Sequence, residues 1–436
     1  MNAPASESRG GSDGAARIGV AFSRGLAPAE VVECVKLAEA LGYESAWMAE
    51  GHAGDQFAIL GACAVATARI RLGTSISSVF VRSAPTIAMA AATVDHLSGG
   101  RFILGLGTSH RVQVEPEHGV PFTRPTDRLR DTVEIVRALS REGVVAHAGR
   151  VLSIERFDLW FQPLRREIPI YIAGLFPPML ELCGEIAQGA MLTWPTLDAP
   201  GRAAQHVGRG AARAGRDPRE IDVASLIPCA VAASRQDALD GLRPGIAFYA
   251  GFFPRYNRLL AESGFAEAVR VVKQAWDRGD QDGATRAVPD ELIDAVAIAG
   301  TAEDCRERVQ AYRRAGLQLP IISGRMKPST KYSQIADANA QATCVPSPSA
   351  RARRYIRTHQ RITDVVRKNP AISHQPPLLR GGMCSPYSGA GGSSASQKSC
   401  RTNWTGSQLT DAHMLSPMIS NARKPQMSDI RPSEPR

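Results

Sequence analysis

Short apolar segments alternate with helix-like segments over the first 326 residues, and this alternation constrains the fold more than any other feature of the chain. Such alternation is typical of α/β proteins built around a parallel sheet. The strand-like segments are apolar throughout rather than at every second residue, as buried parallel strands require. The pattern predicts eight strands, at residues 18–22, 45–49, 70–76, 102–107, 169–173, 190–194, 222–231 and 319–323.

The number of strand–helix units favours one fold class over another. Eight units in roughly 310 residues suit a TIM barrel, the (β/α)8 fold, which takes about 250 residues before insertions. A doubly wound open sheet is the alternative. Its nucleotide-binding fingerprint is missing, because Gly105-x-Gly107 is followed by His110 where a third glycine is needed. We therefore expect an α/β protein, a TIM barrel with insertions.

Three segments interrupt the alternation. A polar stretch rich in histidine and proline at residues 108–125 predicts a long loop, and residues 144–162 form an excursion from the strand–helix pattern. An insertion over residues 236–296 is expected to be mostly helical. It contains five aromatic residues between positions 248 and 256, which suit either a wall over a substrate or packing against a partner subunit.

Charge is concentrated near the carboxyl end of the chain. The sequence carries 52 Lys and Arg against 42 Asp and Glu, a net charge of +10. Residues 327–436 hold 16 of these basic and 5 of these acidic side chains, a net +11, so the first 326 residues are nearly neutral at −1. The polyanion binding that a basic protein suggests is therefore an expectation for the last segment alone.

Composition divides the chain into three expected parts. Residues 327–436 are rich in serine, glycine and proline without sustained periodicity, and such sequences bury too little apolar surface to fold. We expect a flexible N-terminus at residues 1–16, a barrel at 17–326 and a basic, disordered tail at 327–436. The tail is either an inert extension or an arm that binds nucleic acid.

Several classes of protein are disfavoured. No stretch approaches the ~20 consecutive apolar residues of a membrane helix, and residues 1–16 lack the apolar core of a signal peptide. The eight cysteines include no C-x-x-C pair, so the sequence indicates neither a disulfide framework nor a zinc site. We expect a cytoplasmic protein without a bound metal.

In a TIM barrel, chemistry belongs to the carboxyl ends of the strands and the loops after them. Glu50 and His52 follow the second expected strand, Ser75 lies near the end of the third, and Thr108 and His110 follow the fourth. Glu50 and His52 are the best polar candidates there, and histidine suits proton transfer because it titrates near neutral pH. Which of the two acts stays open, and His110 is a weaker candidate.

Four stretches of the sequence carry a family pattern. They are ATARIRLGTSI at 66–76, DHLSGGRFILGLGTS at 95–109, RPTDRLRDTVEIVRAL at 124–139, and PIYIAG followed by CGEIAQGAML at 183–192. Together they resemble the luciferase-like monooxygenase superfamily, most closely its coenzyme F-420-dependent oxidoreductases, which include methylenetetrahydromethanopterin reductase. The resemblance covers about residues 17–323 and leaves the basic tail outside.

The resemblance implies where a flavin-like ring would bind. The family has a non-prolyl cis peptide after its third strand, which supports the ring from behind, and Ser75-Ile76 is the matching pair. Gly107 and Thr108 would approach the ring and its side chain. The loop Gly174-Leu175 would hold the cofactor phosphate, because it precedes a helix that Pro177 opens. Each position also has a purely structural interpretation, as a strand end or an ordinary turn.

The resemblance also implies an activity. Reduced coenzyme F-420 would transfer a hydride to a small organic substrate with a C=C, C=N or methylene-pterin-like group, and Glu50 or His52 would handle the proton. Three alternatives remain: a monooxygenase that uses reduced FMN and oxygen, a non-catalytic relative, and a nucleic-acid-associated protein that acts through its tail. Members of the family are commonly dimers, so the resemblance also implies a homodimer.

Overall fold

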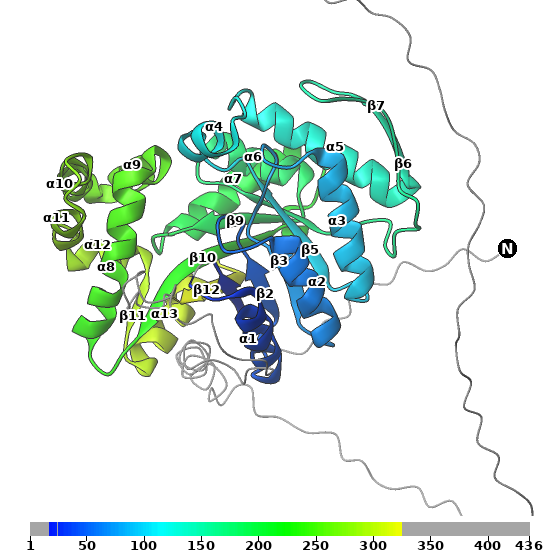
Figure 1. Cartoon of the computed structure of the whole chain (residues 1–436). Helices are drawn as coiled ribbons and strands as arrows, with labels where there is room; N and C mark the ends of the chain where they lie inside the picture. The colour runs from blue at the N-terminus through cyan, green and yellow to red at the C-terminus, as the bar shows by residue number, and fades with distance from the viewer. Residues whose placement is uncertain (1–16, 24, 325–436) are drawn as a thin grey trace, which may run out of the picture. The chain divides into compact units, whose positions relative to one another are not determined.

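The described residues form a closed parallel β-barrel, which confirms the predicted fold class. The computed structural model describes residues 17–23 and 25–324, so residues 1–16 and the tail at 327–436 lie outside it. Eight barrel strands occur within these ranges: β1 (Gly19–Phe22), β2 (Ser45–Met48), β3 (Arg71–Thr74), β5 (Phe102–Gly107), β8 (Ile170–Ala173), β9 (Gly189–Thr193), β10 (Asp222–Val231) and β12 (Leu319–Gly324). They pair in this order, with β12 between β10 and β1, and the pairing of β9 with β10 closes the barrel (Figure 1).

Side chains fill the barrel interior. Trp47 on β2 is completely buried there, and its indole N–H donates a hydrogen bond of 2.9 Å to Ser45 Oγ. At the amino ends of the strands, Arg17 forms ion pairs with Glu44 at 2.8 Å and Asp222 at 2.9 Å. The interior is therefore a packed core, and ion pairs close it at the amino ends of the strands. A ligand has to enter at the carboxyl ends.

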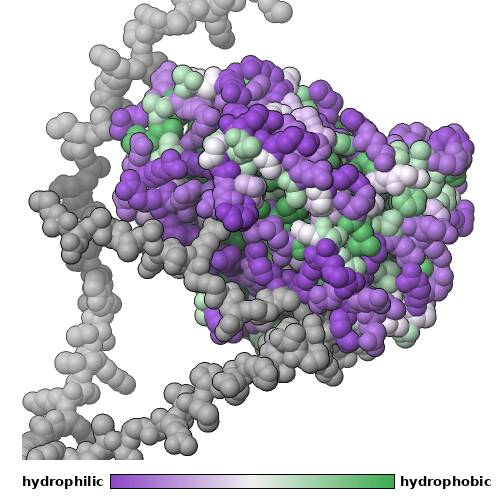
Figure 2. Space-filling view, turned by 180° about the vertical axis from the view of Figure 1, so that it is seen from behind, coloured by the Kyte–Doolittle hydropathy of each residue, from purple (hydrophilic) through white to green (hydrophobic). Residues whose placement is uncertain are grey.

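Helices cover the outside of the barrel. They are α1 (Pro28–Ala40), α2 (Gln56–Ala66), α3 (Ala84–Leu97), α5 (Pro125–Glu142), α6 (Pro177–Ile186), α7 (Ala199–Arg213) and α13 (Ala302–Arg314), with a short 3-10 turn at Pro218–Glu220. Hydrophilic side chains dominate the outer face that Figure 2 shows. Within the described ranges, none of the helices is both long and apolar enough to cross a membrane.

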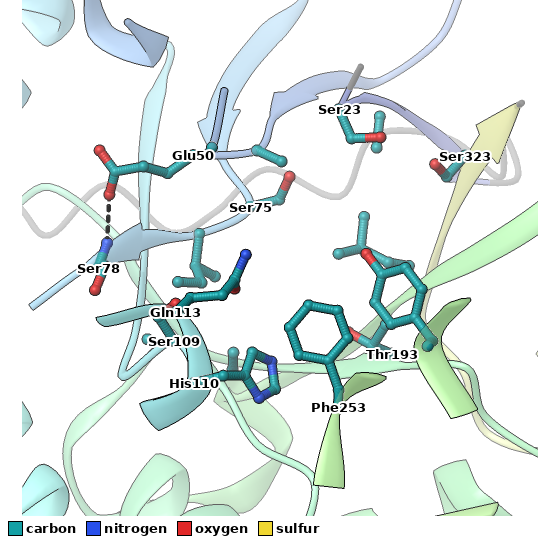
Figure 3. Close-up of a pocket in the computed structure, with 18 of the residues that line it drawn as sticks. Ser23, Glu50, Ser75, Ser78, Ser109, His110, Gln113, Thr193, Phe253 and Ser323 are labelled. Carbon is teal, nitrogen blue, oxygen red and sulfur yellow. Dashed lines mark hydrogen bonds between the residues drawn. The ribbon is translucent and has the colours of Figure 1, made fainter. Parts of the chain in front are cut away.

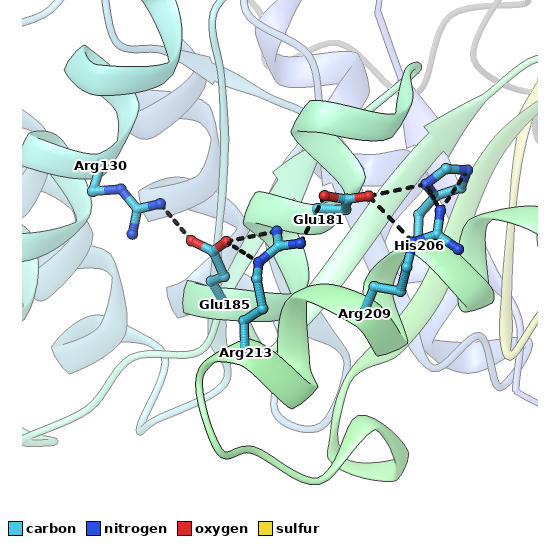
Figure 4. A network of polar contacts seen from close by, with 6 residues as sticks. All are labelled: Arg130, Glu181, Glu185, His206, Arg209 and Arg213. Atoms are coloured by element: carbon cyan, nitrogen blue, oxygen red, sulfur yellow. Dashed lines mark hydrogen bonds and ion pairs between the residues drawn. The ribbon is translucent and has the colours of Figure 1, made fainter.

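Helices α6 and α7 pack so closely that glycine is required where they cross. A Cβ atom on Gly184 would overlap the carbonyl oxygen of Val207, and one on Gly210 would overlap that of Glu181. Around this contact lies a network of charged side chains: Arg213 bridges Glu181 at 2.9 Å and Glu185 at 2.8 Å (Figure 4). The apolar contact sets the distance between the helices, and the exposed ion pairs add little to stability.

The excursion at 144–162 contains an antiparallel hairpin of β6 (Val144–Ala148) and β7 (Ser153–Asp158). Asp131 of α5 is 1% exposed and anchors the hairpin. Its carboxylate accepts backbone N–H bonds from Arg150, Val151 and Leu152 at 3.1, 2.7 and 2.8 Å. These bonds satisfy the buried charge and hold the turn of the hairpin against α5.

The insertion is helical, as expected, and has its own core. It comprises α8 (Arg235–Phe252), α9 (Pro254–Leu260), a π-helical turn (Ala261–Phe265), α10 (Ala266–Asp277), α11 (Gln281–Arg286) and α12 (Asp290–Val296). The short strand β11 (Ile298–Gly300) then pairs with β10 and is not one of the eight strands of the closed barrel. The buried residues of the insertion form a cluster separate from the main core, and Figure 1 shows α8–α12 on the side of the barrel away from the hairpin.

The predicted loop at 108–125 is wrong in part, because it contains the helix α4 (Arg111–His118). Few apolar residues mark this helix in the sequence. It is stabilised instead by an Arg111–Glu115 ion pair of 2.5 Å and by Val114, which is completely buried. Gly119 ends it in the left-handed conformation, with φ of 65°.

Candidate active site at the carboxyl ends of the strands

A large cleft opens at the carboxyl ends of the barrel strands. Its volume is about 1720 Å³, above the roughly 300–1,000 Å³ of a site for one small molecule, so a cofactor and a substrate fit together. Strand ends and the loops after them line one side, and α4, α8 and α9 line the other. Figure 3 shows side chains from both sides pointing into the same space, among them Ser75, His110 and Phe253.

The end of the third strand forms the floor of the cleft. The peptide bond between Ser75 and Ile76 is cis, as the resemblance implied, and it lies between β3 and the two-residue strand β4 (Ser77–Ser78). Ile76 packs against Gly107, where a Cβ atom would lie only 2.7 Å from the Ile76 side chain. Ser75 Oγ is buried and has no hydrogen-bond partner within the described residues. This hydroxyl is free to bond a molecule in the cleft.

Glu50 lies at the cleft, but its carboxylate is occupied. One oxygen accepts the Ser78 N–H at 2.7 Å (Figure 3). The other forms an ion pair of 2.5 Å with Arg82. Arg82 also pairs with Asp55 at 2.5 Å. This geometry suits a carboxylate that positions the loop after β4 better than one that exchanges a proton with a ligand.

The two histidines at the cleft differ sharply in environment. His52 has a side chain that is 80% exposed and lies 3.3 Å from Glu117. His110, the residue before α4, is mostly buried between aromatic rings, 4.7 Å from Phe253 and 5.3 Å from Tyr256. Burial, with a contribution from the cation Arg255, lowers the pKa of His110 to about 4. His110 is therefore neutral at physiological pH, and its Nδ1 has no bonding partner in the part of the chain that the structure describes.

Most, but not all, of the predicted cofactor-binding residues at the ends of β5 and β8 line the cleft. Gly107 and Thr108 line the cleft, and Thr108 is 8% exposed. Leu175 lines it too, whereas Gly174 does not, because its Cβ position faces Leu180 of α6 at 3.0 Å.

The helix that follows Gly174 and Leu175 offers fewer phosphate donors than its position suggests. Pro177 and Pro178 open it and have no N–H, and the N–H groups of Met179 and Leu180 donate to the Phe176 carbonyl. The N–H groups of Leu175 and Phe176 have no partner within residues 17–23 and 25–324 and are the available donors.

Aromatic side chains of the insertion form the opposite wall. Phe253 lies 5.1 Å from Tyr249 and 4.8 Å from Phe252, measured between ring centroids, and Phe248 stacks on Phe252 at 5.5 Å. Phe248, Tyr249 and Phe252 are half-buried, so their rings present apolar surface to the cleft. We call Phe248, Tyr249, Phe252, Phe253 and Tyr256 the aromatic wall.

The structure thus brings together most of the predicted site residues. Glu50, His52, Ser75, Ile76, Gly107, Thr108 and Leu175 all line one cleft. His110, a weaker candidate from the sequence, also lines the cleft and directly precedes a helix that was not predicted, and Arg255 on α9 lines the cleft without having been a candidate. No local sequence signal points to Arg255, since only the fold of the insertion brings α9 to the cleft.

Comparisons with known proteins place the chain in a family. Residues 8–319 match the sequence profile of the Luciferase-like monooxygenase family. The chain is 29% identical over 323 residues to the 5,10-methylenetetrahydromethanopterin reductase of Archaeoglobus fulgidus, which covers 73% of this chain and 96% of the relative.

Two solved structures share the fold. The coenzyme F-420-dependent tetrahydromethanopterin reductase of Methanopyrus kandleri has a TM-score of 0.66 at 24% identity, over 72% of this chain and 95% of that one. The FMN-bound oxygenating constituent of 3,6-diketocamphane monooxygenase from Pseudomonas putida has a TM-score of 0.55 at 16% identity, over 81% and 98%.

Proposed function

The chain belongs to the luciferase-like monooxygenase family, and from this membership we propose that it is an oxidoreductase that uses coenzyme F-420 to reduce or oxidise a small organic substrate. The observation that carries the proposal is the cleft at the strand ends, which has room for a cofactor and a substrate side by side. The chain is also 29% identical over 315 residues to a putative coenzyme F420-dependent oxidoreductase of Mycobacterium tuberculosis, and this similarity favours F-420 over FMN.

The residues of the barrel side suit a flat tricyclic ring. Ile76 offers an apolar surface, and the unpartnered Ser75 hydroxyl offers a hydrogen bond to a polar edge of the ring. Gly107 keeps the backbone of β5 close to Ile76, so the floor stays flat. The N–H groups of Leu175 and Phe176 would hold a phosphate on the cofactor side chain.

When bound, the deazaflavin supplies a hydride to an electrophilic carbon of the substrate, such as a C=C, C=N or methylene-pterin-like group. The chain would orient the two molecules and exclude water through its aromatic wall. Glu50 and His52 stay candidates for moving the accompanying proton. His110 joins them as a neutral imidazole that can hydrogen-bond the substrate within the cleft.

Titration of the purified full-length chain with oxidised F-420 and with FMN tests the proposal. We expect F-420 to bind with micromolar affinity or better and FMN to bind at least about tenfold more weakly, a difference of about 1.4 kcal/mol. Retention of FMN together with NADH-linked oxygen uptake would instead favour the monooxygenase. Failure of both cofactors to bind would leave a non-catalytic relative.

A homodimer and a reducing compartment are part of the same proposal. Val65 on α2 and Met89 and Leu97 on α3 are 68%, 42% and 47% exposed, and these apolar side chains of two neighbouring helices are the candidate contact with a second copy of the chain. The five cysteines within the described ranges are all buried and unpaired, which fits a compartment that keeps thiols reduced. Sedimentation velocity of the purified chain tests the dimer.

A further inference from the structure

The cleft contains a cationic side chain without a counterion. Two arginines line it, Arg82 and Arg255. Arg82 is paired with Glu50 and Asp55, whereas Arg255 makes no hydrogen bond or ion pair with any residue that the structure describes. A guanidinium is almost always charged and presents five donors, so an unpaired one beside a cleft is a ready site for an anion.

The neighbours of Arg255 leave it available. Its guanidinium carbon lies 6.0 Å from the centroid of the Phe122 ring, which orients the side chain without neutralising it. Arg111 and Arg258 lie near enough to repel it, and each of these has its own carboxylate: Arg111 pairs with Glu115 at 2.5 Å and Arg258 with Glu262 at 2.6 Å. Burial and these two cations lower the pKa of Arg255, so its charge lacks compensation.

Arg255 adjoins the aromatic wall in the fold. It lies on α9 directly between Pro254 and Tyr256, and Phe253 ends the helix before it. His110 packs on Phe253 and Tyr256, and its neutral ring adds a hydrogen-bonding group but no charge. The cleft therefore combines the rings of the aromatic wall with one uncompensated cation beside them in the chain.

We propose that the wall of α8 and α9 binds a flat, largely apolar substrate that carries a carboxylate or phosphate group, and that Arg255 binds this anionic group. The rings would stack on the body of the substrate, and the guanidinium would form a charge-assisted, two-point hydrogen bond with its anion. The inference rests on the proposed function, since it assigns the half of the cleft opposite Ser75 and Ile76 to the substrate.

The anion has two possible sources, the substrate and the side chain of the cofactor. The test uses the full-length chain, free and saturated with oxidised F-420, and two probes with the same rings, 2-naphthoate and uncharged 2-naphthamide. Binding of each probe and of F-420 is measured by calorimetry for the wild type, Arg255→Gln and the control Arg258→Gln. Arg258 is a suitable control because it lies one turn further along α9 and is already paired with Glu262.

We expect the wild type to prefer 2-naphthoate over 2-naphthamide by about tenfold, and this preference to fall below about twofold in Arg255→Gln and to persist in Arg258→Gln. A matched Phe252→Leu variant should lower the affinity for both probes equally, since it removes an aromatic ring and no charge. Equal binding of the two probes to the wild type, or a preference that Arg255→Gln retains, would overturn the proposal. The proposal would also be overturned if Arg255→Gln lowered the affinity for F-420 and left the affinities for both probes unchanged, because Arg255 would then bind the cofactor.

The two hypotheses can fail separately. If the free wild-type chain prefers 2-naphthoate but binds no F-420, the proposed function fails and the anion site stands. If F-420 binds tightly and the probes are not distinguished, the proposed function stands and the anion site fails.

Discussion

Two buried polar atoms in the cleft, Ser75 Oγ and His110 Nδ1, have no partner among the described residues. A buried polar group without a hydrogen bond costs about 1–3 kcal/mol, so such groups are rare unless a ligand satisfies them. Glu50 shows the opposite pattern, with both carboxylate oxygens bonded inside the protein. Within the cleft, the unsatisfied atoms of Ser75 and His110 are available to a ligand, whereas the satisfied carboxylate of Glu50 supports the loop after β4.

Ser75→Ala separates these two roles. We expect the variant without cofactor to be as stable as the wild type or slightly more stable, because it loses a hydroxyl that has no partner. Its affinity for F-420 should fall about tenfold, the value of one hydrogen bond of about 1.4 kcal/mol. Urea unfolding and cofactor titration measure the two effects. A loss of stability with unchanged affinity would make Ser75 a structural residue.

His110 makes stability depend on pH. Its pKa of about 4 in the folded chain lies below the ~6.5 of an exposed histidine, so the unfolded state binds more protons between these values. The free energy of unfolding should therefore decrease as pH falls from about 6.5 to about 4, by up to about 3 kcal/mol from this residue. His110→Gln should lack this contribution, as urea unfolding at pH 7 and pH 4.5 would reveal. An identical pH dependence in both proteins would show that His110 is not buried as described.

Substitutions of Glu50 and His52 are expected to differ in their effects on stability. Because Glu50 holds Arg82 and the Ser78 N–H, Glu50→Gln is expected to lower Tm and cofactor affinity together. His52→Gln should leave Tm unchanged, since the side chain is 80% exposed. Thermal unfolding and single-turnover rates of the F-420-loaded variants test both. A Glu50→Gln variant with normal Tm and no turnover would favour Glu50 as the proton carrier.

At the scale of elements, the contact between α6 and α7 gives the sharpest test. Gly210→Ala should lower the stability of the protein by about 2–3 kcal/mol, because its Cβ would overlap the Glu181 carbonyl and the helices would have to separate. Gly208→Ala on the same helix is the control. Nothing lies within 4 Å of its Cβ position, so the better helix propensity of alanine should stabilise it by up to about 1 kcal/mol. Denaturant unfolding of both variants measures these changes in stability. Equal changes in the two variants would contradict the close contact between α6 and α7.

Elements also show where prediction from sequence was strong and where it was weak. The eight barrel strands carry continuous apolar runs, a signal that does not depend on distant residues. Helix α4 has no such signal, because an ion pair and one buried valine stabilise it. The packing of α4 and α9 around His110 in turn determines how that residue behaves.

At the scale of the whole molecule, the basic segment at 327–436 carries the net charge but is predicted to contribute nothing to the site. We expect a chain that ends after Met326 to bind F-420 with unchanged affinity and to melt within about 2 °C of the full chain. Cofactor titration and thermal unfolding of both chains test this. A larger fall in Tm would show that the segment stabilises the barrel.

The same pair of chains tests the nucleic-acid hypothesis. An arm that binds nucleic acid would give the full chain an affinity for duplex DNA that falls steeply with salt and disappears on truncation. We expect weak, salt-sensitive binding at most, and none by the shortened chain, whose net charge is close to zero. Binding of DNA by the shortened chain would contradict the assignment of nucleic-acid binding to the last segment alone.

The sequence by itself determined the barrel and its eight strands, and it predicted a site at their carboxyl ends. These properties follow from apolar runs and turn residues that act over short distances along the chain. The tertiary structure alone decided which polar groups at the site are free. Arg82 pairs with the carboxylate of Glu50, although the two residues are 32 positions apart in the sequence. Aromatic side chains of the insertion bury His110. Helix α9 brings Arg255 to the cleft, where it has no carboxylate partner within the described residues. Whether a side chain is satisfied depends on neighbours distant in sequence, and no local pattern records them.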